Sequence, residues 1–296
     1  MRVKGKIAED SKLELHNPAE IFGFPPSNRS KEAEEVRNAG KCPFTGEKCT
    51  KESRLLNTPF GVCSVWHGGT PRIICPNRFL FGGKALLKQV ASHFLNENQI
   101  QFVKEVPLSH RKGEKRIDYG RVDWVAYKTE ENEAEGIKDF CGIEIMADAT
   151  TQTGELVRAF NDFLNGNLSN RYNYGLNTYN TIKLSFTQIL NKGQVFEHWQ
   201  KYYIWMLQDV LFSNFTRRFN LQISEIPSRK SEKGEKYIIF ATVAMKKSEK
   251  ANFYELRLDK LYHASIDELL RAYHRIDIPP IEHFIDAIKH KSSDNF

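Results

Sequence analysis

Four of the five cysteines in this chain lie within one short stretch, between residues 42 and 75. They are Cys42, Cys49, Cys63 and Cys75, and Cys141 stands alone further along. Because the sequence opens without an apolar leader, we expect a reducing compartment, where thiols stay free and disulfides are rare. Four clustered thiols in such a setting usually bind a metal ion, and this constrains how residues 42–75 fold.

The four cysteines follow the spacing C-x6-C-x13-C-x11-C, with proline and glycine nearby in KCPFTGEKC, FGVC and IICPNRF. Tight turns of this kind aim thiolates at a common point, and four sulfurs complete a tetrahedral shell for zinc or iron. The CxxC pairs typical of zinc sites are missing, so inert core thiols are the alternative interpretation. A structural metal is favoured. We expect it to hold the region together in place of a hydrophobic core of the region's own.

The composition fits a globular protein with a basic surface. Of the 296 residues, 40% are apolar, and the net charge is +6. The longest apolar runs, such as YIIFATVAM, fall short of the ~20 residues that cross a bilayer. Basic residues recur in SHRKGEKR, TRRF, SRKSEKGEK and AMKKSEK. These segments are either solvated loops or contacts to a polyanion whose counterions they displace.

Hydrophobic periodicity divides the chain into three predicted parts: a metal-binding lobe (1–82), a core (83–220) and a C-terminal completion (221–296). The lobe contains a short helix with Ser30 as its N-cap. The later elements are expected in the following order: helix 83–98, strands 100–108, 121–128 and 138–150, helices 177–191 and 194–215 joined by a turn at Lys192 and Gly193, strands 235–247 and 252–264, and two helices after Ser265 and Pro280.

Carboxylates converge on the predicted central strands. Asp123 lies in the middle of one strand and Glu144 in the next, where strand alternation directs Glu144 and residue 146 to one face. Glu105 and Asp148 are further candidates for this face. Such an oxygen-only site suits Mg2+, which activates water and stabilises charge on a phosphodiester. The alternative is a pair of solvated carboxylates that share no metal.

An Asp followed about twenty residues later by Glu-x-Lys is the sparse signature of the PD-(D/E)xK nuclease fold. In this chain residue 146 is Met instead of Lys. A thioether neither donates a hydrogen bond nor carries the charge that would stabilise an attacking hydroxide.

Most of the chain resembles the NotI-type restriction endonucleases. The segments that carry the resemblance are EIFGFP, GVCSVW, IICPNRF, RVDWVAY, FCGIEIMADATTQTG, and the stretch from YGLNTYNTIKLSFTQILNKG to KYYIWMLQDVLF. The resemblance implies an α/β (α+β) fold with a PD-(D/E)xK core of mixed sheet flanked by helices, and an N-terminal four-cysteine lobe. It also implies a Mg2+-dependent type II enzyme that cuts both strands of duplex DNA as a homodimer.

Carried over by position, Asp123 and Glu144 match the family's Mg2+-binding carboxylates, and Glu105 matches an additional acidic position. The four cysteines match a structural site that holds iron in the family, which shifts the preference from zinc to iron. Met146 occupies the position of Lys in most members of the fold and Gln in the NotI branch. Three explanations for Met146 are open. Gln152, Lys128 or Lys183 takes over the role of orienting the nucleophile, the metal ion suffices without such a residue, or the enzyme is catalytically impaired. The Gln of the NotI branch favours an active enzyme.

Arg116 and Arg171, in the basic and amide-rich loops 109–116 and 166–175, are the candidate DNA-binding residues. Arginine pairs with guanine edges, although phosphate contacts use the same groups. Arg72 and Arg78 in the cysteine region are further candidates for a position near the duplex.

Two other functions compete with a restriction enzyme. Met146 keeps open a catalytically impaired or non-catalytic sequence-specific DNA-binding protein with a structural metal, and a nicking or repair nuclease is the third interpretation. For the favoured function we expect the bacterial cytoplasm, no membrane contact, and a cognate DNA methyltransferase that forms no stable complex with this chain.

Overall fold

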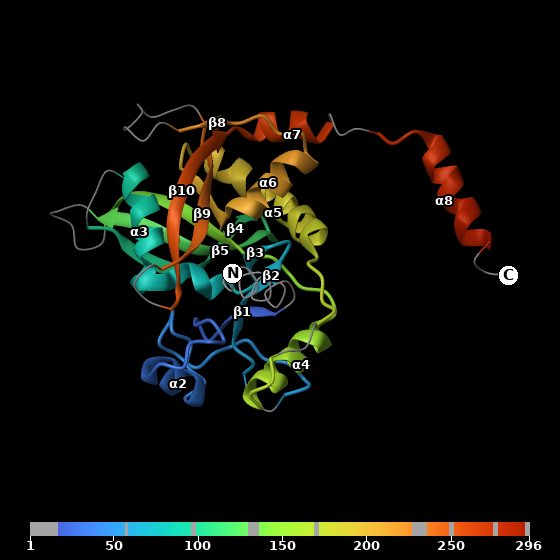
Figure 1. Cartoon of the computed structure of the whole chain (residues 1–296). Coiled ribbons are helices and arrows are strands. Elements are labelled where there is room, and N and C mark those ends of the chain that lie inside the picture. Colours follow the sequence, from blue (N-terminus) through green and yellow to red (C-terminus); the bar gives the residue numbers. More distant parts are fainter. Residues whose placement is uncertain are drawn as a thin grey trace, which may run out of the picture.

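A seven-stranded mixed sheet forms the centre of the molecule (Figure 1). The computed structural model describes residues 17–56, 59–95, 99–129, 136–168, 172–226, 236–248, 252–274 and 278–293. The strand order is β4-β5-β6-β7-β9-β10-β8, in which β7 pairs in parallel with β6 and β9 and the remaining pairs are antiparallel. The strands are β4 (Gln101–Lys112), β5 (Lys115–Thr129), β6 (Ile137–Met146), β7 (Tyr203–Gln208), β8 (Ser224–Glu225), β9 (Ile238–Lys247) and β10 (Tyr254–Ala264).

Helices cover both faces of this sheet, and each face has its own hydrophobic cluster. On one face α3 (Phe81–Leu95) packs on β6 and β10. The other face carries α5 (Thr178–His198), α6 (Asp209–Arg218) and α7 (Ile266–His274). The expected mixed sheet flanked by helices is therefore confirmed.

A small lobe is built around a second sheet of three strands, β1 (Pro18–Ile21), β2 (Val62–His67) and β3 (Thr70–Ile73). Around it lie α2 (Lys31–Asn38) and α4 (Thr153–Leu164), at the bottom of Figure 1, and the short 3-10 helix η2 (Pro76–Leu80), which contacts α3. Ser30 caps α2 as predicted, since its side chain accepts a hydrogen bond from the Ala33 N–H.

The lobe shares a hydrophobic core with the large sheet. Ile21, Phe60 and Val62 belong to the same buried cluster as Leu87 of α3 and Ile143 of β6. The apolar residues of the segment 42–75 therefore pack against α3 and α4 as well as against one another, in a core that is shared with the sheet and is not the segment's own.

The predicted helix 194–215 was also wrong. Helix α5 continues through Gly193 to His198, and residues 203–208 form β7, all six of them buried. A parallel strand covered on both faces is a continuous apolar run, which periodicity does not distinguish from a buried helix. Gly193 lets α5 approach the sheet, since a Cβ there would lie 2.8 Å from Ile238 Cδ1.

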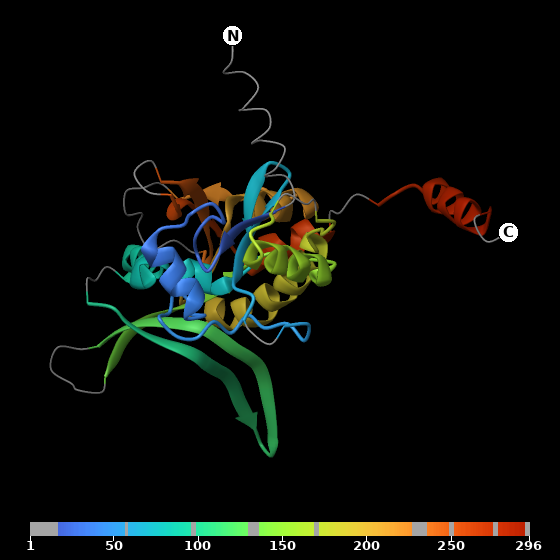
Figure 2. The same ribbon diagram turned by 60° about the horizontal axis from the view of Figure 1, so that its bottom comes forward.

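The predicted loop at residues 109–116 is instead a β-hairpin. Strands β4 and β5 extend beyond the neighbouring strands and project from the body as a two-stranded ribbon, closed at Gly113 and Glu114 (Figure 2). The two C-terminal strands are β9 and β10 as predicted. The helix expected after Pro280 is α8 (Ile281–Ser293), which lies apart from the sheet in Figure 1. Among the residues of the chain that are described, no helix is long and apolar enough to span a bilayer.

We predict that Gly142→Ala lowers the free energy of unfolding by about 1–3 kcal/mol, the usual cost of overpacking a core. A Cβ at Gly142 in β6 would lie 2.6 Å from Phe196 Cζ and 3.0 Å from Tyr203 Cδ2. Denaturant titration measures the change. Gly154→Ala is the control, since nothing lies within 4 Å of its added Cβ. Equal stability of the two variants would contradict this account of the packing.

Candidate functional site

Asp123 and Glu144 lie next to each other on the antiparallel strands β5 and β6. Their neighbours Trp124 and Ile143 form a cross-strand pair whose side chains pack on the α3 side. Because side chains alternate along a strand, Asp123 and Glu144 both face α5. Asp123 Oδ2 accepts a hydrogen bond of 2.9 Å from the Ile145 N–H. Burial is the main cause that raises the pKa of Asp123.

Glu144 is buried, and two side chains donate hydrogen bonds to the same carboxylate oxygen. Oε1 accepts hydrogen bonds from Tyr203 Oη at 2.8 Å and from Lys192 Nζ at 2.7 Å. Burial, reinforced by the nearby charge of Asp123, raises the pKa of Glu144 to about 7. Two adjacent carboxylates, half-buried Asp123 and buried Glu144, therefore lie in one cluster with the Lys192 ammonium.

Glu105 lies in β4 opposite Asp123, between the cross-strand pairs Lys104–Trp124 and Val106–Val122. Its backbone has φ of 57°, in the left-handed region that a non-glycine residue seldom adopts. Strain of this kind is concentrated at functional sites. The structure thus places Glu105 with Asp123 and Glu144, and its charge contributes to raising the pKa of Asp123.

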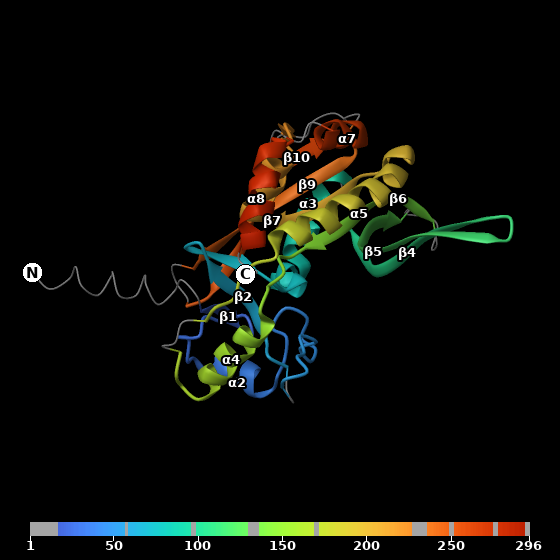
Figure 3. The same cartoon turned by 90° about the vertical axis from the view of Figure 1, so that its right-hand side faces the viewer.

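These carboxylates line a large cleft with a volume of about 1420 Å³. One wall comes from the cysteine region, including Lys48 and Asn77, and from Lys84 at the start of α3. The opposite wall is α5. Figure 3 shows α5 running along the sheet, with the lobe below it and the ribbon projecting beyond. The cleft therefore lies where lobe, sheet and helix meet.

A polar stripe of α5 faces this cleft. It consists of Thr181, Ser185, Gln188 and Lys192, spaced four, three and four residues apart. This spacing places side chains on one face of a helix. The same spacing in the sequence could have placed Lys192 on this face of α5. The predicted turn between two helices at Lys192 and Gly193 interrupted the pattern.

Met146 is buried in the cleft wall, where its sulfur accepts a hydrogen bond from Ser185 Oγ. The three suggested substitutes lie elsewhere. Gln152 is exposed before α4, Lys183 is exposed on α5, and neither lines the cleft. Lys128 donates to the Leu95 carbonyl at 2.8 Å, beside α3. The structure brings Lys192 to the carboxylates instead.

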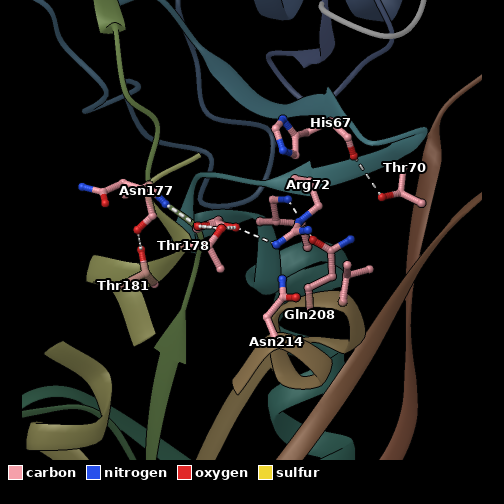
Figure 4. Close-up of polar contacts among 12 residues, drawn as sticks. His67, Thr70, Arg72, Asn177, Thr178, Thr181, Gln208 and Asn214 are labelled. Carbon is pink, nitrogen blue, oxygen red and sulfur yellow. Dashed lines mark hydrogen bonds and ion pairs between the residues drawn. The ribbon is translucent and has the colours of Figure 1, made fainter. Parts of the chain in front are cut away.

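Asp148, Arg72 and Arg78 are held in ion pairs. Arg72 of β3 binds Asp148 Oδ2 at 2.7 Å, and Asp148 also accepts from Thr178 Oγ1 at the start of α5 (Figure 4). Gln208 of β7 also connects the lobe to the sheet. Its side-chain amide donates to the Pro71 carbonyl and accepts a hydrogen bond from the Ile73 N–H. Arg78 is fully buried against Glu20. These two arginine side chains join the lobe internally and to the core, and their position near DNA stays a prediction.

Arg116 lies on the ribbon, 60% exposed and 3.6 Å from Asp118. It is cross-strand to Arg111, and Lys112 is paired with Lys115. Arg171 lies outside the described residues, so the structure does not place it.

The four clustered cysteines are free, buried and brought together around one small cavity of about 10 Å³. Burial raises the pKa of the Cys63 thiol, as does the neighbouring Cys75. Lys51 lines the same cavity and donates to the Ile74 carbonyl at 2.9 Å. In the parts of the chain that are described, no group of three or more His, Cys, Asp or Glu side chains is arranged tightly enough to hold a metal. The donor set still suits a soft thiolate-bound cation.

A mixed sheet flanked by helices, with adjacent carboxylates in a cleft, is the arrangement of a nuclease-like core. The family model described as "Restriction endonuclease NotI" matches residues 28–254. The chain belongs to this family of restriction endonucleases, which act on DNA. A search of curated proteins found no match.

Proposed function

We propose that this protein is a type II restriction endonuclease that makes sequence-specific double-strand breaks by Mg2+-dependent phosphodiester hydrolysis. The observation that carries the proposal is the adjacent pair of half-buried Asp123 and buried Glu144 in a cleft of about 1420 Å³. Two adjacent carboxylates with an additional acidic group, Glu105, are the hard oxygen ligands that Mg2+ prefers.

Asp123 and Glu144 would hold the cation. Tyr203 and Lys192 both bind Glu144 Oε1, and the Ile145 N–H binds Asp123 Oδ2, so Glu144 Oε2 and Asp123 Oδ1 would remain for the cation. Bound Mg2+ lowers the pKa of water and neutralises charge on the phosphate. The residues of the chain orient this chemistry: the Ile145 N–H fixes Asp123, and Tyr203 fixes Glu144.

The ribbon of β4 and β5 is the proposed DNA-reading element. A two-stranded β-ribbon fits the major groove, and its tip carries Arg111, Lys112, Lys115 and Arg116. Arg116 and Asp123 share strand β5, and seven residues of extended chain separate them by about 23 Å. Strand β5 thus connects the proposed DNA-reading residue Arg116 to the proposed catalytic residue Asp123. Arg171 stays a proposed second contact.

The four cysteines would hold one structural iron or zinc ion, and a homodimer would present one carboxylate pair to each DNA strand. A cognate methyltransferase would protect the host sequence in the bacterial cytoplasm without forming a stable complex with this protein.

Plasmid digestion in Mg2+, compared with DNA binding in Ca2+, tests the function. We expect discrete linear fragments whose ends, once sequenced, share one site. Binding without cutting would favour the non-catalytic DNA-binding protein that Met146 suggests. Relaxed circles would favour a nicking or repair nuclease.

We predict that Arg116→Ala weakens binding of the mapped site about tenfold, because one arginine contact to a base is worth about 1–3 kcal/mol. Fluorescence anisotropy in Ca2+ measures the dissociation constant. Arg257→Ala is the matched control, since Arg257 is equally exposed and paired with a nearby acid, Glu255. An equal loss on unrelated DNA would assign Arg116 to phosphate, and no loss would exclude it from the interface.

A further inference from the structure

We propose that Lys192 supplies the positive charge that Met146 lacks and contacts the reacting phosphate or its attacking water. This inference rests on the proposed nuclease function and names a catalytic residue for it. The positive charge would then come from helix α5, 46 residues after position 146, the strand position that usually carries it.

The surroundings of Lys192 are made for a charged group. Its side chain is 7% exposed, yet its Nζ donates to Glu144 Oε1 at 2.7 Å and to the Arg121 carbonyl of β5. Burying an ammonium is costly unless it is paired and hydrogen-bonded. The backbone at Gly120 passes close to the lysine stem, with a Cβ position 3.6 Å from Lys192 Cε. These contacts fix the ammonium against both carboxylate-bearing strands.

Lys192 and Met146 reach the same cleft from opposite sides. Met146 follows Glu144 by two residues on β6 and touches Ser185, which lies two helical turns before Lys192 on α5. Both side chains line the cleft together with Asp123 and Glu144. An ammonium from α5 therefore lines the same cleft as the side chain of residue 146 and directly contacts Glu144.

The ammonium has a donor left for substrate. It carries three N–H groups, and two are used by Glu144 and Arg121. The third is available to a phosphate oxygen or to the attacking water. A fixed cation in a low-dielectric site stabilises the charge that develops as phosphorus becomes five-coordinate.

Hydrolysis of the phosphodiester leaves Lys192 chemically unchanged. The water oxygen forms a bond to phosphorus while the bond from phosphorus to the leaving deoxyribose oxygen breaks. One water proton passes to solvent, the leaving oxygen takes up a proton from solvent, and Lys192 stays protonated throughout.

The competing role is structural, in which Lys192 only neutralises buried Glu144. Lys192→Met alone does not separate the two roles, because it also leaves Glu144 without its partner. Moving the positive charge from α5 to β6 does separate the catalytic role from the structural one. The double variant Met146→Lys with Lys192→Met returns an ammonium to the cleft from the strand side.

We expect Lys192→Met to bind the mapped site in Ca2+ within about threefold of wild type and to cut about a hundredfold more slowly in single turnover. The double variant is expected to recover at least tenfold of that loss. Calorimetric Mn2+ titration of Lys192→Met is expected to retain the metal affinity that Glu144→Gln loses. Lys183→Met, an exposed lysine of the same helix, is the control.

Cleavage by Lys192→Met within threefold of wild type overturns the proposal. So does a folded double variant that is no faster than Lys192→Met, because the lysine is then structural. If Lys192→Met does not fold, Lys192→Gln, which still donates to Glu144, is judged by the same criteria. Absence of cutting by the wild type refutes the nuclease function itself, so the two failures are distinguishable.

Discussion

Glu144→Ala and Glu144→Gln proteins are expected to cut duplex DNA at least about a thousandfold more slowly than wild type in Mg2+, because a catalytic cation contributes several kcal/mol to the transition state. Single-turnover cleavage of the mapped site measures the rate. Alanine also leaves Lys192 and Tyr203 without the oxygen that both bind. Loss of one partner of a buried ion pair costs about 3–5 kcal/mol of stability.

The glutamine variant separates these two effects. Its amide oxygen still accepts hydrogen bonds from Lys192 and Tyr203, whereas the neutral amide is a poor ligand for Mg2+. We therefore expect Glu144→Gln to melt close to wild type and still fail to cut. Glu225→Gln, an exposed acid paired with Lys260 on the far edge of the sheet, is the matched control. A wild-type rate in Glu144→Gln would refute the assignment of the site.

The position of the carboxylates could be predicted from sequence because it depends on local pattern. Strands around Asp123 and Glu144 alternate apolar and polar residues, and this alternation decides which face each side chain takes. The α3-side packing of Trp124 and Ile143 confirms that face. Two adjacent antiparallel strands then bring their carboxylates together without any long-range information.

Lys192 depends on long-range packing, and sequence reasoning missed it for that reason. Its contact with Glu144 spans 48 residues and exists only because α5 crosses the sheet beside β7. The apolar run of β7 was interpreted as helix, which removed the strand that orders this region. The ion pairs of Arg72 and Arg78 were missed for the same reason, because a basic residue in a sequence does not reveal a buried acid, Asp148 or Glu20, that pairs with it.

The cysteine region was predicted in part. The sequence indicated that four thiols converge, and all four line one cavity of about 10 Å³. The hydrophobic residues between them, such as Phe60 and Val62, pack into a core shared with α3 and α4. The shared core therefore supports the lobe that forms a wall of the cleft, and the proposed metal would support the same lobe.

Cys63→Ser is expected to reduce the metal content of the protein and to destabilise the lobe, with loss of DNA affinity preceding any change in the cleavage step. A site that four thiolates fill has no open position for water or substrate, so the proposed ion supports structure and does not take part in chemistry. Elemental analysis measures the metal and distinguishes iron from zinc. Thermal melting and anisotropy in Ca2+ measure the other two effects.

Cys141→Ser is the matched control, because Cys141 is buried in β6 and is not one of the residues that line the cysteine cavity. It should lose stability through burial of a hydroxyl but keep the metal. At saturating concentrations of the Cys63→Ser protein, all the DNA is bound. We expect this bound DNA to be cut at a rate near wild type, since Asp123, Glu144 and Lys192 lie outside the lobe. Unchanged metal content and stability together with lost cleavage would contradict this division, and would place the cysteines in the reaction itself.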